Sequence, residues 1–203
     1  MSQLNHGKRD EQTIQLASGF IARYGALRGE DDENDGCFRM NGDGRLELAL
    51  TVSPRSVSTI RRFIESYVAE AAGRLGADSN LAARVALTIH ELLENVALYG
   101  QYNHGTLCLA PTSSEGPRRL TITVTNTTTP EHIDRLQQAL RETATAADPT
   151  AHYLMLMRRE VGRDASGLGL ARIRAEAEME LSMAIDRNEV RVSATSEIFG
   201  GEP

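Results

Sequence analysis

The sequence predicts an α+β protein in which helices form one layer against a mixed, mainly antiparallel sheet. Apolar residues alternate at every second position near residues 46–52 and again in the second half of the chain, which is typical of strands. Segments with helical spacing lie between these strands. Because helices and strands do not alternate strictly, a parallel α/β fold is not favoured.

The composition is ordinary for a globular protein, with 40% hydrophobic and 25% charged residues among 203. A net charge of −6 argues against a nucleic-acid binder, and the low aromatic content argues against a base-stacking platform. No apolar run is long enough to span a membrane, and the first residues lack the apolar core of a signal peptide. Two cysteines, Cys37 and Cys108, fit a reducing compartment. We therefore expect a cytoplasmic protein with no nucleic-acid or membrane partner.

The chain is expected to divide into an appendage (1–43), a main domain (44–198) and a short tail (199–203). Apolar residues recur at helical spacing up to Leu27, which predicts an amphipathic helix. The acidic run 29–36 has glycine at both ends and is typical of a solvated linker.

The main domain is predicted to begin with a strand and a long helix. Leu46–Val52 alternates at period two, as a strand with one buried face does. Ser53 is a good N-cap and Pro54 suits the first helical position, so we expect a helix from here to about Leu75.

The next helix, expected over Leu81–Tyr99 with Gly100 as its stop, carries the first functional candidates. Glu91 and Asn95 are four residues apart, so they lie one above the other on a single face. A carboxylate there can take a proton from a nucleophile, and an amide oxygen can bind Mg²⁺. The same spacing also occurs on ordinary amphipathic helices, so a second motif is needed. The buried stripe of the helix is predicted to contain Leu81, Val85, Ile89, Leu92 and Val96.

The second half of the domain is predicted to alternate pairs of strands with helices. In order, we expect antiparallel strands at 106–110 and 119–125, helices beginning at Thr129-Pro130 and Asp148-Pro149, a helix ending near Glu178, and a closing hairpin of strands 180–185 and 190–193.

The second motif is a glycine-rich turn at the start of the last helix, Ser166-Gly167-Leu168-Gly169-Leu170. Glycines permit a positive φ and close approach of a ligand, and the free N–H groups of a helix start attract phosphate. Such turns are also frequent for purely structural reasons. Three arginines just upstream either neutralise phosphates or form a solvated basic patch: Arg158, Arg159 and Arg163.

The Glu-x-x-x-Asn helix, two following strands, a helical lid and Gly-Leu-Gly-Leu, in this order, resemble the GHKL ATPase superfamily of gyrase, Hsp90, histidine kinases and MutL. The compact arrangement is most similar to the anti-sigma-factor serine/threonine kinases of bacterial partner-switching systems, the SpoIIAB and RsbW type. The resemblance extends to divergent kinases of such modules, the SiaB type. It covers about residues 44–198 and implies the GHKL (Bergerat) ATP-binding fold, with ATP and Mg²⁺ as ligands.

The resemblance also implies roles for individual residues. Glu91 falls on the catalytic base, which activates the attacking hydroxyl or water. Asn95 falls on the residue that holds Mg²⁺ against the triphosphate. The glycine-rich turn falls on the box whose backbone binds phosphates, under a lid at about 144–166.

Two positions depart from the family pattern. Where the family carries Asp-x-Gly-x-Gly, this chain has Val124–Pro130, with Asn126 in place of the aspartate that contacts adenine and three threonines in place of the flexible turn. The β-branched threonines resist a positive φ. Ala165 stands where the glycine box often begins with glycine. The metal and phosphate residues are therefore retained, while the adenine contact is altered.

Two other motif interpretations are rejected. The sequence around His90 looks like a zinc-protease helix, but Glu94 stands where the second histidine ligand is required. Residues before Leu46 are too few for the dimerisation hairpin and sensor of a sensor histidine kinase.

Two functions remain open. The first is a serine/threonine kinase that phosphorylates a STAS-like antagonist or serves a sigma-like regulator. The second is a degenerate GHKL-fold binding module that regulates its protein partner without nucleotide turnover. The resemblance also implies a tendency to form homodimers.

Overall fold

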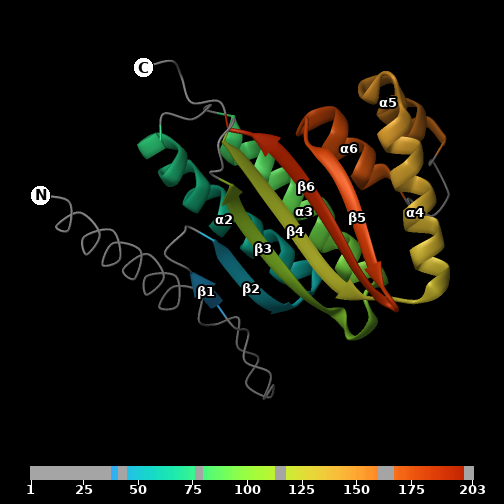
Figure 1. Cartoon of the computed structure of the whole chain (residues 1–203), viewed down its shortest axis with the longest axis horizontal. Coiled ribbons are helices and arrows are strands. Elements are labelled where there is room, and N and C mark those ends of the chain that lie inside the picture. The colour runs from blue at the N-terminus through green and yellow to red at the C-terminus, as the bar shows by residue number, and fades with distance from the viewer. Residues whose placement is uncertain (1–37, 41–44, 76–79, 113–117, 160–166, 199–203) are drawn as a thin grey trace, which may run out of the picture.

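The computed structural model describes residues 38–40, 45–75, 80–112, 118–159 and 167–198. The strands of one sheet are ordered β1-β2-β3-β4-β6-β5, and every neighbouring pair among them is antiparallel. The predicted α+β, two-layer architecture is confirmed (Figure 1). The elements are β1 (Phe38–Met40), β2 (Leu46–Thr51), α2 (Pro54–Leu75), α3 (Leu81–Tyr99), η2 (Gln101–Asn103), β3 (His104–Thr112), β4 (Arg119–Thr127), α4 (Pro130–Thr145), α5 (Pro149–Arg159), α6 (Leu168–Glu176), β5 (Glu180–Asp186) and β6 (Glu189–Glu197).

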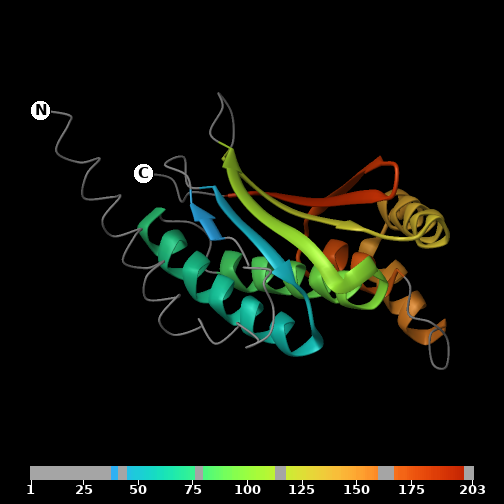
Figure 2. The same cartoon turned by 90° about the horizontal axis from the view of Figure 1, so that it is seen from below.

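Helices α2 and α3 cover one face of the sheet, and no described helix covers the other face (Figure 2). The uncovered face of β4 and β6 is polar. There the Thr121 and Thr195 hydroxyls lie 3.2 Å apart, and the Thr123 and Ser193 hydroxyls lie 3.0 Å apart. Alternation along β4 and β6 thus places apolar side chains on the helix layer and hydroxyls on the other side.

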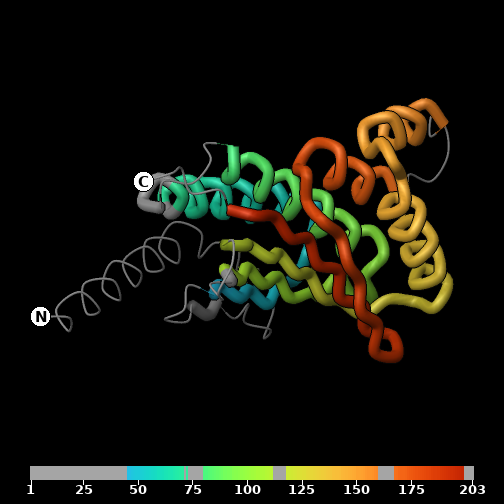
Figure 3. Tube along the Cα trace, turned by 45° about the horizontal axis from the view of Figure 1, so that its top comes forward, coloured from blue at the N-terminus to red at the C-terminus, as the bar shows by residue number. Residues whose placement is uncertain are grey.

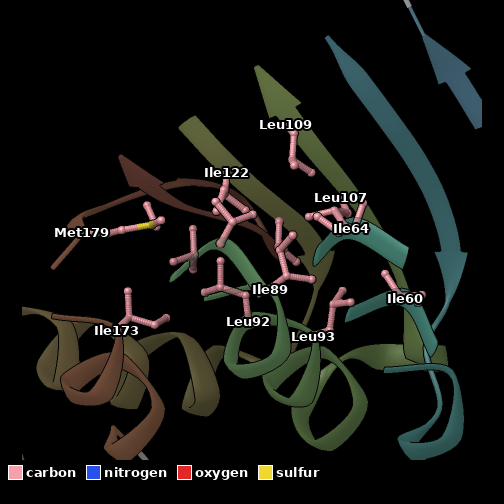
Figure 4. Close-up of a cluster of buried hydrophobic side chains, with 14 of the residues drawn as sticks. Ile60, Ile64, Ile89, Leu92, Leu93, Leu107, Leu109, Ile122, Ile173 and Met179 are labelled. Carbon is pink, nitrogen blue, oxygen red and sulfur yellow. The ribbon is translucent and has the colours of Figure 1, made fainter. Parts of the chain in front are cut away.

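The core lies between the sheet and helices α2, α3 and α6 (Figure 4). All five residues of the stripe predicted on α3 are buried, and Val85 and Ile89 are fully enclosed. The stripe meets fully buried side chains of the opposing elements, including Ile64, Leu107 and Ile122. The 3.6-residue period read from the sequence therefore identifies the face on which α3 packs.

Helix α2 begins with the cap predicted at Ser53. The backbone N–H of Ser56 donates to Ser53 Oγ at 3.1 Å, and the backbone N–H of Ser53 donates to Ser56 Oγ at 2.7 Å. This reciprocal pair satisfies two backbone donors that the first helical turn leaves without partners.

Helix α3 ends at Gly100, as predicted. Gly100 has an extended backbone (φ −71°, ψ 136°) instead of a left-handed one. A Cβ at this position would lie 2.5 Å from the carbonyl oxygen of Val96, so close approach of the backbone requires glycine. The left-handed conformation falls on Tyr102 (φ 60°) and Asn103 (φ 54°), which turn the chain into β3.

Helices α4, α5 and α6 gather at one end of the molecule, beside the β5–β6 hairpin (Figure 3). The backbone N–H of Thr128, just before α4, donates to the carbonyl oxygen of Asn188 in the hairpin turn at 2.9 Å. Thr129 caps α4, and the Asp148 carboxylate accepts from the backbone N–H of Ala151 at 2.9 Å at the start of α5. Both caps were expected from the Thr-Pro and Asp-Pro pairs.

Part of the predicted domain division lies outside the described residues. The helix expected before Leu27, the acidic run 29–36 and the tail 199–203 are in this category. Strand β1 falls within the segment assigned to the appendage, and Phe38 pairs with Leu48 of β2. None of the helices in the described part of the chain combines the length and apolarity needed to cross a bilayer.

Candidate functional site

A cavity of about 50 Å³ lies between α3, α4, the start of α6, and strands β4 and β6. Four residues predicted for the site line this cavity: Asn95, Asn126, Gly167 and Leu170. They come from three segments that are far apart in the sequence. Helix α3 supplies the first, strand β4 the second, and the start of α6 the last two. The fold therefore brings together the residues of both sequence motifs.

Asn95 is half-buried and faces the cavity from α3. Its amide oxygen is a suitable ligand for a hard cation. Within the described ranges, no group of three or more His, Cys, Asp or Glu residues is arranged to hold a metal ion.

The two glycines at the start of α6 serve different purposes. Gly167 has φ +102°, a left-handed conformation that glycine adopts without strain, and it precedes α6 with no side-chain cap for the first turn. A Cβ on Gly169 would lie 2.8 Å from Glu91 Oε2, so a side chain at this position would displace that carboxylate oxygen. Ser166 lies outside the described residues, and Leu168 is half-buried at the first position of α6.

Glu91 lies between α3 and α6, next to the cavity, but it is not one of the lining residues. The residue is only 8% exposed. Its Oε1 atom accepts a hydrogen bond from Arg172 Nη1 at 2.9 Å. Burial raises the pKa of Glu91, and the hydrogen bond and charge of Arg172 oppose this rise. The carboxylate is thus partly desolvated, paired at one oxygen, and close to the glycine turn at the other.

Arg172 belongs to a chain of polar contacts that reaches the surface. Its Nε atom donates to Glu176 Oε2 at 2.8 Å, one turn further along α6. Tyr153 of α5 lies near this pair, and its pKa is raised by burial and by the Glu176 carboxylate. The network therefore connects the predicted base on α3 with helices α6 and α5.

Two residues on the Glu91 side of α3 fix the position of α6. Arg84 Nε donates to the carbonyl oxygen of Ala177 at 2.6 Å, just after α6, and Arg84 Nη2 donates to Ser196 Oγ at 2.8 Å. The buried Thr88 hydroxyl lies 3.2 Å from Met179 Sδ. These contacts hold the end of α6 against α3, and so help to set the distance between Glu91 and the glycine turn.

The segment around Asn126 forms the end of a regular strand. Asn126 pairs with Val190 of β6, and Thr127 pairs with Glu189. The buried Thr128 hydroxyl donates to the carbonyl oxygen of Tyr99 at 2.6 Å, which satisfies a group at the end of α3. Thr127 therefore ends β4, Thr128 holds the end of α3, and Thr129 caps α4.

The sequence analysis missed several residues at this site. Arg135 and His132 of α4 line the cavity, and the His132 ring lies 4.8 Å from the Tyr99 ring. Their spacing with Leu136 and Ala139 on one helical face was the available signal. In contrast, Arg158 and Arg159 are exposed at the end of α5 and do not line the cavity, whereas Arg163 lies outside the described residues.

The fold is similar to that of a chain in a structure described as the crystal structure of the SiaB–SiaC complex from Pseudomonas aeruginosa. The TM-score is 0.54 at 17% sequence identity, and the match covers 75% of this chain and 89% of that chain. At this identity the likeness establishes the fold alone. No family model matches the sequence, and no curated protein matches it.

Proposed function

We propose that this chain is an ATP-binding regulatory protein of the GHKL type that phosphorylates a serine or threonine of a protein partner. The observation that carries the proposal is the meeting of Asn95, Asn126 and Gly167 at one cavity. The resemblance found in the sequence assigns these three positions to metal, adenine and phosphate. The similar fold from a two-protein complex supports a protein as the partner, and the resemblance suggests a STAS-like antagonist.

The residues that line the cavity are of the chemical types that a magnesium–nucleotide complex requires. Mg²⁺ bound to a nucleotide needs few protein ligands, because phosphates and water supply most of its coordination. Asn95 would hold the ion, and the start of α6 at Gly167 would face the phosphates with its free N–H groups. Arg135, which also lines the cavity, offers a positive charge to the same ligand.

Helix α4 would have to move for a nucleotide to enter. The cavity measures about 50 Å³, whereas ligand pockets enclose roughly 300–1,000 Å³. Helix α4 is attached lightly, since only Ile133 and Thr143 among its residues are buried. Outward displacement of α4 would enlarge the cavity, and it would uncover Ile133 of the core and the three partly buried apolar residues of α4 that pack against the core: Leu136, Ala139 and Leu140.

In the proposed reaction, Glu91 accepts the proton of the attacking hydroxyl. The hydroxyl oxygen forms a bond to the γ-phosphorus while the bond to the ADP oxygen breaks, giving ADP and a phosphorylated partner. With water as the nucleophile, the products are ADP and inorganic phosphate. Partial burial suits this role, because a base works best when its pKa lies near the working pH.

A second candidate function is favoured by the ion pair of Glu91 with Arg172 and by the small size of the cavity. In this alternative the fold regulates its partner by docking alone, with no nucleotide turnover. The pair would then be a structural contact between α3 and α6.

Phosphate release from Mg-ATP by the purified full chain distinguishes the two functions. We expect slow release by the native protein, and at least a 100-fold loss in Glu91→Ala, the scale of losing a general base, with ATP binding retained. The matched control is Glu94→Ala. Glu94 is an exposed carboxylate one turn away on the same helix, and it pairs with His90. Equal rates in the native protein and Glu91→Ala would contradict the assignment of the base, and no release by the native protein would favour the docking function.

A further inference from the structure

The two carboxylate oxygens of Glu91 lie in different surroundings. Oε1 is bound by Arg172 at 2.9 Å. Oε2 lies toward the start of α6, where a Cβ on Gly169 would be only 2.8 Å away. A charge-assisted hydrogen bond to one carboxylate oxygen restricts rotation about the last side-chain bond, and so favours one direction for the other oxygen.

Arg172 is itself held in place. Its Nε atom donates to Glu176 at 2.8 Å while its Nη1 atom donates to Glu91, so the guanidinium uses two of its nitrogens on two carboxylates. This arrangement uses the rigid planar fork of arginine, which a lysine ammonium cannot reproduce. Arg172 is two residues beyond the last glycine-motif residue, Leu170, and was not predicted as part of the site.

We propose that Arg172 is a positioning residue for the base: it fixes Glu91 Oε1 and thereby directs Oε2 toward the glycine turn at the start of α6. This inference rests on the proposed function, since it concerns the orientation of the base in that reaction. Arg172 also offsets part of the cost of burying the Glu91 charge, and it thereby favours the ionised form, which is the form that accepts a proton.

Among the described residues, the charged and titratable groups that act on Glu91 or on its partner Arg172 lie on α3, α5 and α6. On α3 they are His90 and Glu94, which pair with each other at 3.2 Å. On α6 and α5 they are Arg172, Glu176 and Tyr153. Among these neighbours Arg172 is the group in direct hydrogen-bonding contact with the Glu91 carboxylate. Its removal should therefore move the titration of Glu91 to higher pH.

The test compares Arg172→Gln, Arg172→Lys and the matched control Arg119→Gln in the full chain. Arg119 forms an exposed pair with Glu197 at 3.2 Å between β4 and β6, distant in sequence and contacts from Glu91. We expect Arg172→Gln to reduce phosphate release from Mg-ATP at pH 7 by about 10- to 100-fold, the range found for partners that orient ligands in metal sites. The affinity for Mg-ATP should change less than about threefold, because Arg172 does not line the cavity.

The pH readouts separate positioning from a purely structural role. In Arg172→Gln, the acid limb of the rate profile and the carboxyl ¹³C titration of Glu91 should both move to higher pH. Arg172→Lys keeps the positive charge but lacks the planar guanidinium. It should therefore bring the titration of Glu91 back toward that of the native protein more fully than it restores the rate of phosphate release. Circular dichroism checks that each variant is folded, and Arg172→Lys decides the question if Arg172→Gln does not fold.

The possible failures are distinct. If the native protein releases no phosphate, both the proposed function and the role of Arg172 in it are overturned. If the native protein is active but the rate profile and the Glu91 titration are the same in all Arg172 variants, the positioning role alone is overturned. A loss of rate accompanied by an equal loss of Mg-ATP affinity would also overturn it, because it would indicate a binding role.

Discussion

At the scale of single residues, the site is governed by a balance between burial and charge. Glu91 is desolvated by the packing of α6, which raises its pKa, while Arg172 supplies a compensating charge. Asn95, one turn away, is uncharged, so it lines the cavity without needing a compensating charge. Glu91 and Asn95, which share one face of α3, therefore have different surroundings.

This balance predicts a specific pH dependence of stability. Because the folded-state pKa of Glu91 is raised above 4.5, the folded protein binds the proton more tightly than the unfolded chain. The stability contributed by Glu91 is therefore fully present below pH 4.5 and is lost as pH rises through the folded-state value. As pH rises from 4.5 through the folded-state pKa, the free energy of unfolding of Glu91→Gln should increase relative to that of the native protein, because glutamine does not titrate. Urea unfolding of the two proteins measures this difference.

The Glu94→Gln variant is the control for that experiment, because Glu94 is exposed on the same helix. The quantity compared is the free energy of unfolding of Glu91→Gln minus that of the native protein. If this difference does not change with pH, or falls as pH rises, the pKa of Glu91 is not raised.

At the scale of elements, the sequence predicts those features that depend on local pattern. The stripe on α3 and the caps at Ser53, Thr129 and Asp148 are all found where the residues indicate. The features that were missed depend on partners distant in the sequence. Arg172 contacts Glu91, a residue 81 positions away. No local period carries that information.

The cap of α2 gives a test at this scale. Ser53→Ala removes the oxygen that accepts from the backbone N–H of Ser56, so we expect a loss of about 1 kcal/mol in the free energy of unfolding. Ser66→Ala is the matched control on the same helix, where the exposed hydroxyl bonds only to the Arg62 carbonyl oxygen one turn back. Urea denaturation measures both, and equal effects would contradict the capping role.

At the scale of the whole molecule, the described helices lie on one face of the sheet and supply the core with it (Figure 2), whereas the other face of β4 and β6 is polar. The predicted two-layer α+β class is confirmed. The site is at the end of this layer, where α4 and α5 attach to the core through few buried residues: α4 has two and α5 has none. Helix α3 has ten buried residues and α4 has two, which is the arrangement that a widening cavity would need.

The difference between core and periphery can be measured on α3 itself. Leu93 is fully buried and Leu98 is 69% exposed. Leu93→Ala should reduce the free energy of unfolding by about 2–5 kcal/mol, because it removes packed volume from the core. Leu98→Ala should change it by less than about 0.5 kcal/mol. Similar losses in the two variants, measured by urea denaturation, would contradict the orientation of α3.

The central claim, that the cavity beside α3 binds a magnesium–nucleotide complex, is tested most directly by calorimetric titration of the full chain with ATP, with and without Mg²⁺. We predict micromolar binding that depends on Mg²⁺ in the native protein and loses this dependence in Asn95→Ala. No binding up to millimolar ATP, or tight binding that is independent of Mg²⁺ in both proteins, would contradict the claim.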